Sequence, residues 1–308
     1  MKIVSGSSNV DLAEKVAKQL GLSLTPLEIF IFPDGERRIR VFEDVIEQDC
    51  IIIQPTNPDV DTNYIELFLI IDALKRNGAR EITVIMPYMG YQRQDHQFRD
   101  GECVSLEVMI KAIESLGADK IITFDMHSIR IPDLFHIPIK HLSAIELFAQ
   151  TIRKNGWEND DTILISPDMG GINRVKLLSA ALDDMTYANV VKNRDLDTGK
   201  VVAADIDCAS STWKNKSFDG KRLILVDDMI SSGHTIDEAG KLLKKLDAGE
   251  MHTFVTHAIF SSEAPKILQN SLMENIYVTD CVFVPKEKEF AKLKIVSIAR
   301  KVAEEVKN

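Results

Sequence analysis

Residues 222–235 read RLILVDDMISSGHT and are followed by apolar residues at helical spacing. The first five residues predict a buried strand, which delivers two adjacent carboxylates, Asp227 and Asp228, at its C-terminal end. Open α/β sheets bind their ligands at that edge. The Ser/Gly/Thr loop then opens a helix, whose backbone N–H groups and dipole favour a negative charge. The pattern predicts a strand–loop–helix unit that cradles a phosphate group.

The paired aspartates are the informative part of this segment. An ordinary capped turn, with Thr235 as the helix cap, would explain the Ser and Thr residues but not two adjacent carboxylates. Carboxylates beside a phosphate would normally repel it. We therefore interpret Asp227 and Asp228 either as acceptors for sugar hydroxyls or as magnesium ligands.

Short β-branched runs alternate with amphipathic helical segments along the chain. The predicted strands are Ile51–Gln54, Ile82–Met86, Lys120–Phe124, Thr162–Ser166, Arg222–Val226 and His252–Ala258. The predicted helices are Asn63–Asn77, Leu106–Leu116 and Thr235–Leu246. Nearly continuous apolar strands separated by helices indicate a mainly parallel sheet that is covered on both faces. The fold class is α/β.

A weak internal repeat indicates how the chain is divided. Two blocks, Cys50–Tyr88 and Arg222–Phe260, match in length and in element order. They predict two similar α/β domains, over residues 1–145 and 146–285. We expect residues 286–308 to form a final helix, Lys286–Lys307, that packs on the first domain.

The composition excludes several classes of protein. The chain has 308 residues, 45% of them apolar, and a formal net charge of −10 without blocks of basic residues, so a nucleic-acid partner is not expected. Its four cysteines are far apart, which argues against a disulfide framework and fits a reducing cytosol. No apolar run suits a membrane span or a signal peptide, so we expect a cytoplasmic protein.

Four further motifs lie at turns or predicted strand ends. Taken alone, Phe32-Pro-Asp34-Gly35-Glu36 is typical of a turn, and Arg93-Gln94-Asp95 of a solvated loop. Asp125-Met-His127 ends the predicted strand Lys120–Phe124. Pro167-Asp168-Met-Gly-Gly171 follows the predicted strand Thr162–Ser166, and its glycines allow close approach to a ligand.

These motifs and their order resemble the ribose-phosphate pyrophosphokinase family over essentially the whole chain. The resemblance implies two domains of the type I phosphoribosyltransferase kind. It also implies magnesium-dependent transfer of the diphosphoryl group of ATP to C1 of ribose 5-phosphate. The family works as homo-oligomers built from dimers, and a hexamer is the form we expect.

The resemblance implies a role for each motif. Asp34, Gly35 and Glu36 would contact the adenine of an ATP bound by a neighbouring subunit, and Phe32 would stack on it. The other ATP-binding residues would be Arg93, Gln94, Asp95 and His127. The residues that engage Mg²⁺ would be His127 and Asp168.

The second half would bind ribose 5-phosphate. The implied binding residues are Asp227, Asp228, Ser231, Ser232, Gly233, His234 and Thr235. Lys192 matches the family's catalytic lysine and Arg194 its ribose-phosphate-binding arginine. Without the resemblance, both would be interpreted as part of a solvated, charged loop.

The sequence departs from the family pattern at several positions. Family members commonly carry Gln-x-Gln-Gly-Phe-Phe where this chain has Ser128–Phe135, so phosphate activation and ADP inhibition are not implied. His234 replaces a usual glycine. Either its backbone has an ordinary φ and its side chain faces solvent, or its imidazole reaches the sugar phosphate. Two other functions stay open at this point, a type I phosphoribosyltransferase and a non-catalytic regulatory subunit of the same family.

Overall fold

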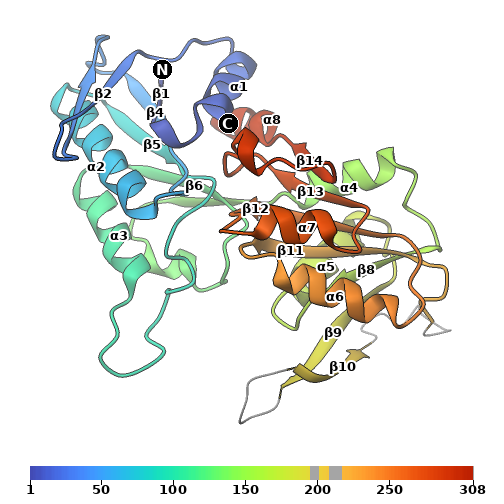
Figure 1. Ribbon diagram of the computed structural model, residues 1–308. Helices are drawn as coiled ribbons and strands as arrows, with labels where there is room; N and C mark the ends of the chain where they lie inside the picture. Colours follow the sequence, from blue (N-terminus) through green and yellow to red (C-terminus); the bar gives the residue numbers. More distant parts are fainter. Residues whose placement is uncertain (195–200, 208–216, 308) are drawn as a thin grey trace. The chain divides into compact units, whose positions relative to one another are not determined.

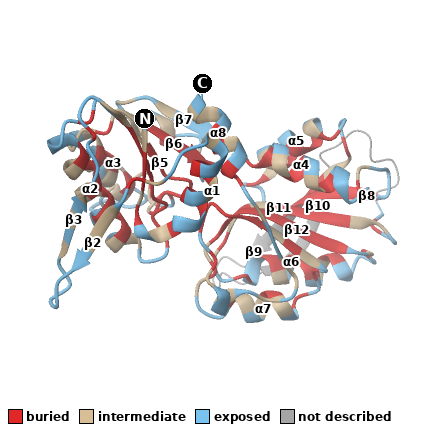
Figure 2. Ribbon diagram, turned by 90° about the horizontal axis from the view of Figure 1, so that it is seen from above, coloured by how far each residue is buried: buried red, intermediate tan, exposed pale blue. Residues whose placement is uncertain are grey.

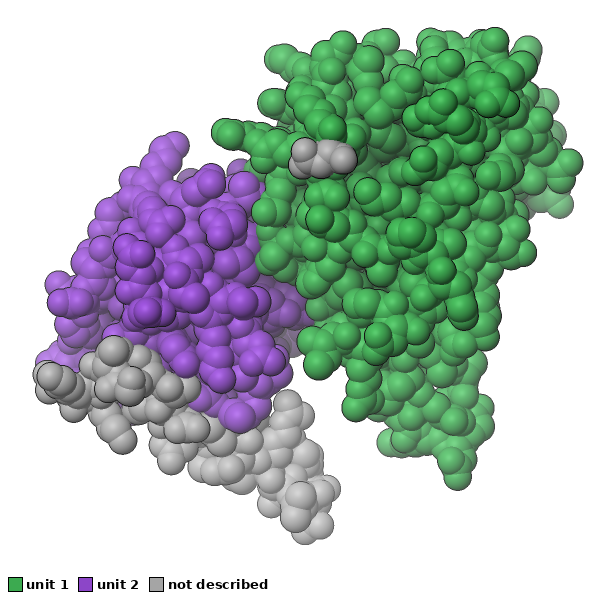
Figure 3. Space-filling view, turned by 180° about the vertical axis from the view of Figure 1, so that it is seen from behind, with its two compact units in different colours: residues 1–143, 280–283, 297–308 green, residues 144–279, 284–296 purple. Residues whose placement is uncertain are grey.

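The computed structural model describes residues 1–194, 201–207 and 217–307, and for 191–194 and 201–207 it describes the backbone alone. The chain divides into two units (Figure 3). Unit 1 comprises Met1–Ser143, Asp280–Phe283 and Ser297–Asn308, and unit 2 comprises Ala144–Thr279 and Val284–Val296. Among the described residues, no helix has both the length and the apolar character that a membrane crossing requires.

Unit 1 is built on a parallel sheet with the strand order β1-β4-β5-β6-β7 (Figure 1). Its strands are β1 (Lys2–Ser5), β4 (Asp49–Ile53), β5 (Glu81–Ile85), β6 (Lys120–Phe124) and β7 (Ile139–Leu142). Neighbouring strands are parallel throughout, as in the register Ile3↔Ile51. A separate antiparallel hairpin pairs β2 (Leu27–Ile31) with β3 (Arg37–Val41).

Helices cover this sheet. They are α1 (Val10–Leu20), α2 (Val60–Arg76), α3 (Ser105–Ser115) and α8 (Ala299–Lys307), with 3₁₀ turns η1 (Ser7–Asn9) and η2 (Ile131–Leu134). Buried side chains of α2 and α3 form one apolar cluster with Val4, Ile52 and Val84. Successive strand residues point to opposite faces, so Ile3 and Ile51 face the other side, where α1 contacts β1 and β4.

The end of the chain differs from its prediction. The sequence predicted one helix over Lys286–Lys307, and this is wrong. Residues 286–296 instead form the 3₁₀ turn η3 (Lys286–Lys288) and the strand β14 (Leu293–Val296), and the helix α8 is limited to Ala299–Lys307, where it packs against α1. The β-branched pair Ile295 and Val296 suits a strand, and pairing with β13 decides the outcome.

Unit 2 contains a seven-stranded sheet with the order β10-β9-β8-β11-β12-β13-β14. Its strands are β8 (Thr162–Ser166), β9 (Tyr187–Arg194), β10 (Val201–Asp207), β11 (Arg222–Ile230), β12 (Met251–Ala258), β13 (Asn275–Thr279) and β14. All neighbours are parallel except β10, which is antiparallel to β9. The helices are α4 (Ile145–Lys154), α5 (Ile172–Ala181), α6 (His234–Lys244) and α7 (Ala264–Asn270).

Both faces of the unit 2 sheet are buried at β8 and β12, as the apolar strands predicted (Figure 2). Ile163 and Leu225 belong to a cluster with side chains of α6 and α7, whereas Leu164 belongs to a cluster with α4 and α5. All eight residues of β12 are buried. The predicted α/β class with mainly parallel sheets is confirmed, and the six predicted strands correspond to β4, β5, β6, β8, β11 and β12.

Asp280 fastens the C-terminal segment to the rest of unit 1. Its side chain is 8% exposed. Its Oδ1 accepts a hydrogen bond from the Ile298 N–H at 2.8 Å, and its Oδ2 accepts one from Lys15 Nζ at 3.1 Å. The Asn9 side chain donates to the Asp280 carbonyl at 2.8 Å.

We expect Asp280→Ala to loosen α8. The variant leaves a buried N–H group unsatisfied, which costs about 1–3 kcal/mol. Amide hydrogen exchange in α8 should therefore accelerate by roughly ten- to a hundredfold. Asp11→Ala is the matched control, because Asp11 pairs with the same Lys15 Nζ at 2.6 Å but is exposed. That variant should change exchange in α8 by less than about threefold. Equal effects of the two variants would contradict the role of Asp280.

Candidate active site

The two aspartates lie inside β11 and not after it. The strand continues past its predicted end at Val226 to Ile230, and Asp227 pairs with Val255 of β12. On its other side, β11 pairs with β8 only as far as Leu225. The carboxylates therefore lie at a staggered edge, where β8 has ended and the loop that follows it begins.

One arginine, which the sequence analysis did not single out, lies against both carboxylates. Arg174 is in the first turn of α5, with Nη1 at 3.6 Å from Asp227 Oδ1 and Nη2 at 3.8 Å from Asp228 Oδ1. A cation near a helix N-terminus opposes the helix dipole. That mismatch, at a helix opening on the ligand edge, is the sequence signal that could have identified Arg174.

Asp227 is held in an unfavourable electrostatic environment. Burial raises the pKa of its carboxyl group well above the ordinary value, and the neighbouring Asp228 and the more distant Asp168 add to this effect. Arg174 acts in the opposite direction. A carboxylate whose pKa is strongly perturbed, at the edge of a sheet where ligands bind, is typical of a functional site.

The loop after β11 leads directly into α6. Ser231 Oγ lies 3.2 Å from Ser261 Oγ, and Ser232 is exposed. Gly233 carries the positive φ, at 82°, and caps the helix. His234 is the first helical residue, so its backbone is ordinary and its side chain is exposed. This arrangement matches the first of the two alternatives for His234.

The helix start leaves backbone donors available. Gly233, rather than Thr235, is the cap of α6, and no side chain caps it. The first N–H groups of a helix have no partner within the helix. Such N–H groups and the helix dipole favour an anion, so the start of α6 suits the phosphate cradle that the sequence predicted.

The loop after β8 forms a closed turn beside this edge. Ser166 Oγ donates to the Asp168 carbonyl at 2.6 Å, and the Gly171 N–H donates to Asp168 Oδ1 at 3.1 Å. A Cβ atom on Gly171 would come within 2.7 Å of Ser166 Oγ, so the turn requires glycine. Asp168 itself is exposed and is the third carboxylate of the edge.

Lys192 and Arg194 lie on β9, in the antiparallel pairing with β10 that includes Ala204↔Lys192. Without the family resemblance, the sequence predicted a loop here. That prediction is wrong, because the backbone of both residues forms a strand. The side chains of both residues lie outside the described part of the chain.

In unit 1, Phe32, Asp34, Gly35 and Glu36 form the exposed turn of the β2–β3 hairpin. The Phe32 N–H donates to the Glu36 carbonyl at 2.8 Å, and Asp34 Oδ1 accepts from the Glu36 N–H at 3.2 Å. Phe32 is 37% exposed and makes an edge contact with Phe30 at 4.9 Å. The predicted turn is confirmed, and it carries carboxylates beside an accessible aromatic ring.

A buried ion pair anchors the base of this hairpin. Arg37 Nε lies 3.5 Å from Oε2 of Glu66, whose side chain is fully buried. Glu66 also accepts hydrogen bonds from the Ser7 N–H at 2.6 Å and from Gln54 Nε2 at 2.9 Å. These contacts were not predicted, because Arg37 follows the turn motif and Glu66 lies on a distant helix.

The Arg93-Gln94-Asp95 segment was predicted as a solvated loop, but one of its residues is buried. Arg93 is exposed and Gln94 half-buried, but Asp95 is buried. Burial acts to raise the pKa of Asp95, yet hydrogen bonds from Ser128 and His96 outweigh it and hold the pKa below its ordinary value. Asp95 thus ties this segment to the residue after His127.

His127 is exposed after β6. Its backbone N–H donates to Oε1 of the buried Gln92 at 3.0 Å. The backbone of His127 therefore lies beside the segment that carries Arg93.

The described residues are compatible with Mg²⁺ that is shared with a substrate. Mg²⁺ prefers oxygen ligands and is usually held by one or two carboxylates together with phosphates and water. Within the described part of the chain, no three His, Cys, Asp or Glu side chains are grouped as a complete metal site. The exposed Asp168 carboxylate suits a Mg²⁺ ion that is held jointly by the protein and a bound phosphate.

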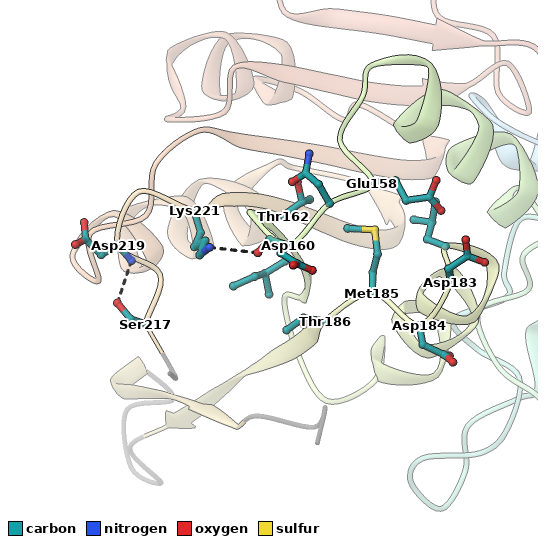
Figure 4. A pocket seen from close by; sticks show the side chains of 13 residues that line it. Glu158, Asp160, Thr162, Asp183, Asp184, Met185, Thr186, Ser217, Asp219 and Lys221 are labelled. Atoms are coloured by element: carbon teal, nitrogen blue, oxygen red, sulfur yellow. Dashed lines mark hydrogen bonds between the residues drawn. The ribbon is translucent and has the colours of Figure 1, made fainter. Parts of the chain in front are cut away.

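A cavity of about 870 Å³ lies at the opposite edge of the unit 2 sheet. Figure 4 shows acidic side chains around it, among them Glu158, Asp183 and Asp184, with Lys221 donating to the Asp160 carbonyl. Its lining comes from the amino ends of β8 and β11. Negative charge of this density disfavours phosphorylated ligands, so the candidate site stays at the carboxyl edge.

The fold of unit 2 defines an α/β protein of the phosphoribosyltransferase type. Residues 133–277 match the family model of the phosphoribosyl transferase domain. Residues 1–117 match the model of the N-terminal domain of ribose phosphate pyrophosphokinase.

Relatives similar over the whole length narrow this class. A ribose-phosphate pyrophosphokinase of Fusobacterium nucleatum is 34% identical, with 97% of this chain and 91% of the relative covered. One of Gloeobacter violaceus is 34% identical, with 99% and 89% covered. The crystal structure of phosphoribosylpyrophosphate synthetase from Mycobacterium smegmatis matches with a TM-score of 0.90 at 28% identity, over 99% of this chain and 97% of that chain. The chain belongs to the ribose-phosphate pyrophosphokinase family.

We expect Asp227→Asn to stabilise unit 2. A carboxyl group whose pKa is raised by folding destabilises the native state increasingly as pH rises toward and through that pKa. Near pH 8 the variant should unfold at a temperature higher by roughly 2–4 °C, and the gain should shrink toward about pH 5. Thermal unfolding followed by circular dichroism without Mg²⁺ gives the unfolding temperatures of both proteins at each pH.

Asp161→Asn is the control for this substitution. A hydrogen bond with Lys221 holds the pKa of Asp161 below the ordinary value, so removal of the Asp161 charge should not stabilise the protein. The electrostatic interpretation would be contradicted if Asp227→Asn did not raise the unfolding temperature near pH 8, or if it raised that temperature equally at every pH.

Proposed function

We propose that this chain transfers the diphosphoryl group of ATP to the C1 hydroxyl of ribose 5-phosphate, giving 5-phosphoribosyl 1-diphosphate and AMP for nucleotide biosynthesis. The observation that carries the proposal is the edge of unit 2. There, Asp227 and Asp228 adjoin a loop that opens a helix, in a chain whose whole-length relatives are ribose-phosphate pyrophosphokinases.

The edge of unit 2 supports binding of ribose 5-phosphate. In this proposal the loop from Ser231 to Thr235 binds the 5-phosphate through backbone N–H groups at the start of α6. Asp227 and Asp228 accept hydrogen bonds from the ribose hydroxyls, because ionised carboxylates are acceptors only. This division of roles explains why carboxylates lie next to a phosphate cradle.

The hairpin and the loops of unit 1 support binding of ATP. Phe32 offers an accessible ring for stacking, and Asp34 and Glu36 offer acceptors for the adenine amino group. Arg93 is an exposed cation suited to the phosphates. We propose that the hairpin serves an ATP bound by a neighbouring subunit of a cytoplasmic homo-oligomer, built from dimers into a hexamer.

The chemistry accounts for the remaining residues. The C1 oxygen attacks the β-phosphorus of ATP, the bond from that phosphorus to the oxygen bridging the α-phosphorus breaks, and AMP leaves. Such a transfer depends on positioning and on neutralising charge. We propose that Lys192 and Arg194 supply positive charge, and that Asp168 and His127 engage Mg²⁺. When bound, Mg²⁺ would neutralise the charge of the phosphates.

The test is to incubate the protein with Mg-ATP and ribose 5-phosphate and to follow phosphorus NMR. The proposal expects AMP and a new diphosphoryl ester in equal amounts, with no product when ribose 5-phosphate is omitted. ADP as the product, or no turnover, would refute it. Formation of a nucleotide from added base and phosphoribosyl diphosphate would instead support a phosphoribosyltransferase.

Asp34→Ala tests the ATP end of the site. We expect ATP affinity to fall roughly tenfold, because a hydrogen bond to a charged group is lost, with ribose 5-phosphate affinity unchanged within about twofold. Isothermal titration calorimetry measures both affinities. Asp44→Ala is the control: Asp44 Oδ1 accepts the Ile46 N–H at 2.9 Å, as Asp34 Oδ1 accepts that of Glu36. A loss confined to ribose 5-phosphate, or equal losses of ATP affinity in both variants, would count against the assignment.

A further inference from the structure

Arg174 occupies a defined place among the charges of unit 2. Its guanidinium spans the two carboxylates of β11, and its side chain is 15% exposed. It lies next to the preceding turn, since a Cβ atom on Gly171 would be in van der Waals contact with Arg174 Nη1, at 3.6 Å. The arginine is thus built into the edge of the sheet and is not a surface cation that happens to lie near an acid.

Stability of α5 does not explain this arginine. A cation in the first helical turn opposes the helix dipole by about 0.3–1 kcal/mol. The carboxylates it contacts are themselves unfavourable, because Asp227 is buried next to Asp228 and near Asp168. Arg174 compensates the charge of the carboxylates, but the cluster as a whole adds nothing to the apolar core, so the presence of the two carboxylates requires a reason other than folding.

The shape of the guanidinium supplies that reason. Its nitrogens form a rigid planar fork, so two of them can hold two acceptors at a fixed separation. Here Nη1 lies 3.6 Å from Asp227 Oδ1 and Nη2 lies 3.8 Å from Asp228 Oδ1, so each nitrogen forms an ion pair with a different carboxylate. The Asp228 N–H also donates to Asp227 Oδ1 at 2.9 Å, which further limits rotation of that carboxylate. A lysine ammonium would supply the charge but not the geometry.

We propose that Arg174 is a positioning residue, which holds Asp227 and Asp228 in the orientation that accepts hydrogen bonds from the vicinal hydroxyls of a ribose phosphate. The inference rests on the proposed function, because it assumes that these carboxylates bind the sugar. It adds that selection of ribose over 2-deoxyribose depends on a side chain that need not touch the sugar.

Relative affinity for two sugars tests this role. Ribose 5-phosphate and 2-deoxyribose 5-phosphate share the phosphate and differ by one hydroxyl. Damage to the fold or to the phosphate cradle lowers both affinities equally and leaves their ratio unchanged. Loss of carboxylate orientation lowers the affinity for ribose 5-phosphate more than that for 2-deoxyribose 5-phosphate, because only ribose 5-phosphate has the 2-hydroxyl. Isothermal titration calorimetry of the full-length protein gives both affinities.

The wild-type protein should prefer ribose 5-phosphate by about ten- to a hundredfold, as expected for one hydrogen bond to a charged acceptor. Arg174→Gln should bring this ratio to within about threefold of unity. Arg174→Lys keeps the charge but not the planar geometry of the guanidinium, and it should also lower the ratio at least about threefold. Lys176→Gln removes an exposed cation from the same helix and should leave the ratio unchanged.

Two outcomes would overturn the inference. In the first, Arg174→Lys has the same ratio of affinities for the two sugars as the wild type. In the second, Arg174→Gln lowers both affinities and leaves their ratio unchanged. If Arg174→Gln does not fold, as judged by circular dichroism, Arg174→Lys decides. A wild-type protein that binds and discriminates the sugars but forms no diphosphoryl ester in phosphorus NMR would refute the proposed activity and leave the inference about Arg174 standing.

Discussion

A parallel sheet that is covered on both faces can present polar groups to a ligand only where its strands end. All residues of β8 and of β12 are buried, so neither face of unit 2 offers space for a substrate there. The carboxyl ends are different, because β11 extends beyond its pairing with β8 and carries Asp227 past the last paired residue, Leu225. The stagger between two neighbouring strands therefore determines where charge can gather, and the loops after those strands supply the remaining groups.

The same architecture is used differently in the two units. In unit 1 the loop after β1 is satisfied within the protein, because the Ser7 N–H and Oγ donate to the buried carboxylate of Glu66. In unit 2 the loop after β11 opens a helix at Gly233 whose first N–H groups have no partner within that helix. In unit 1 the buried carboxylate of Glu66 thus closes the edge and supports the base of the hairpin through Arg37, whereas in unit 2 no side chain caps the helix that opens at the edge.

Much of the fold could be predicted because its signal is local. Buried parallel strands are continuous apolar runs, and β6 and β8 have the bounds that their runs predicted. The prediction for the final segment was wrong because its charged residues match a helical pattern, whereas β14 forms by parallel pairing with β13, a strand that lies earlier in the chain. Tertiary pairing of this kind overrides local propensity, and no window of sequence contains it.

The site could be predicted only where its residues are adjacent in the chain. Asp227, Asp228 and the following loop form one motif, but the partner of those carboxylates, Arg174, lies on another helix and resembles an ordinary surface arginine. Asp95 likewise reads as solvated, although burial and a hydrogen bond with Ser128 place it inside. In both cases the missing information is which charge compensates which. Since an uncompensated buried charge is among the most costly features of a fold, a carboxylate pair on a buried strand already requires a cation close by. That requirement predicts a cation near Asp227, and an arginine placed against the dipole of a helix is a candidate, but only the tertiary structure brings the start of α5 to the same edge as β11 and so identifies Arg174.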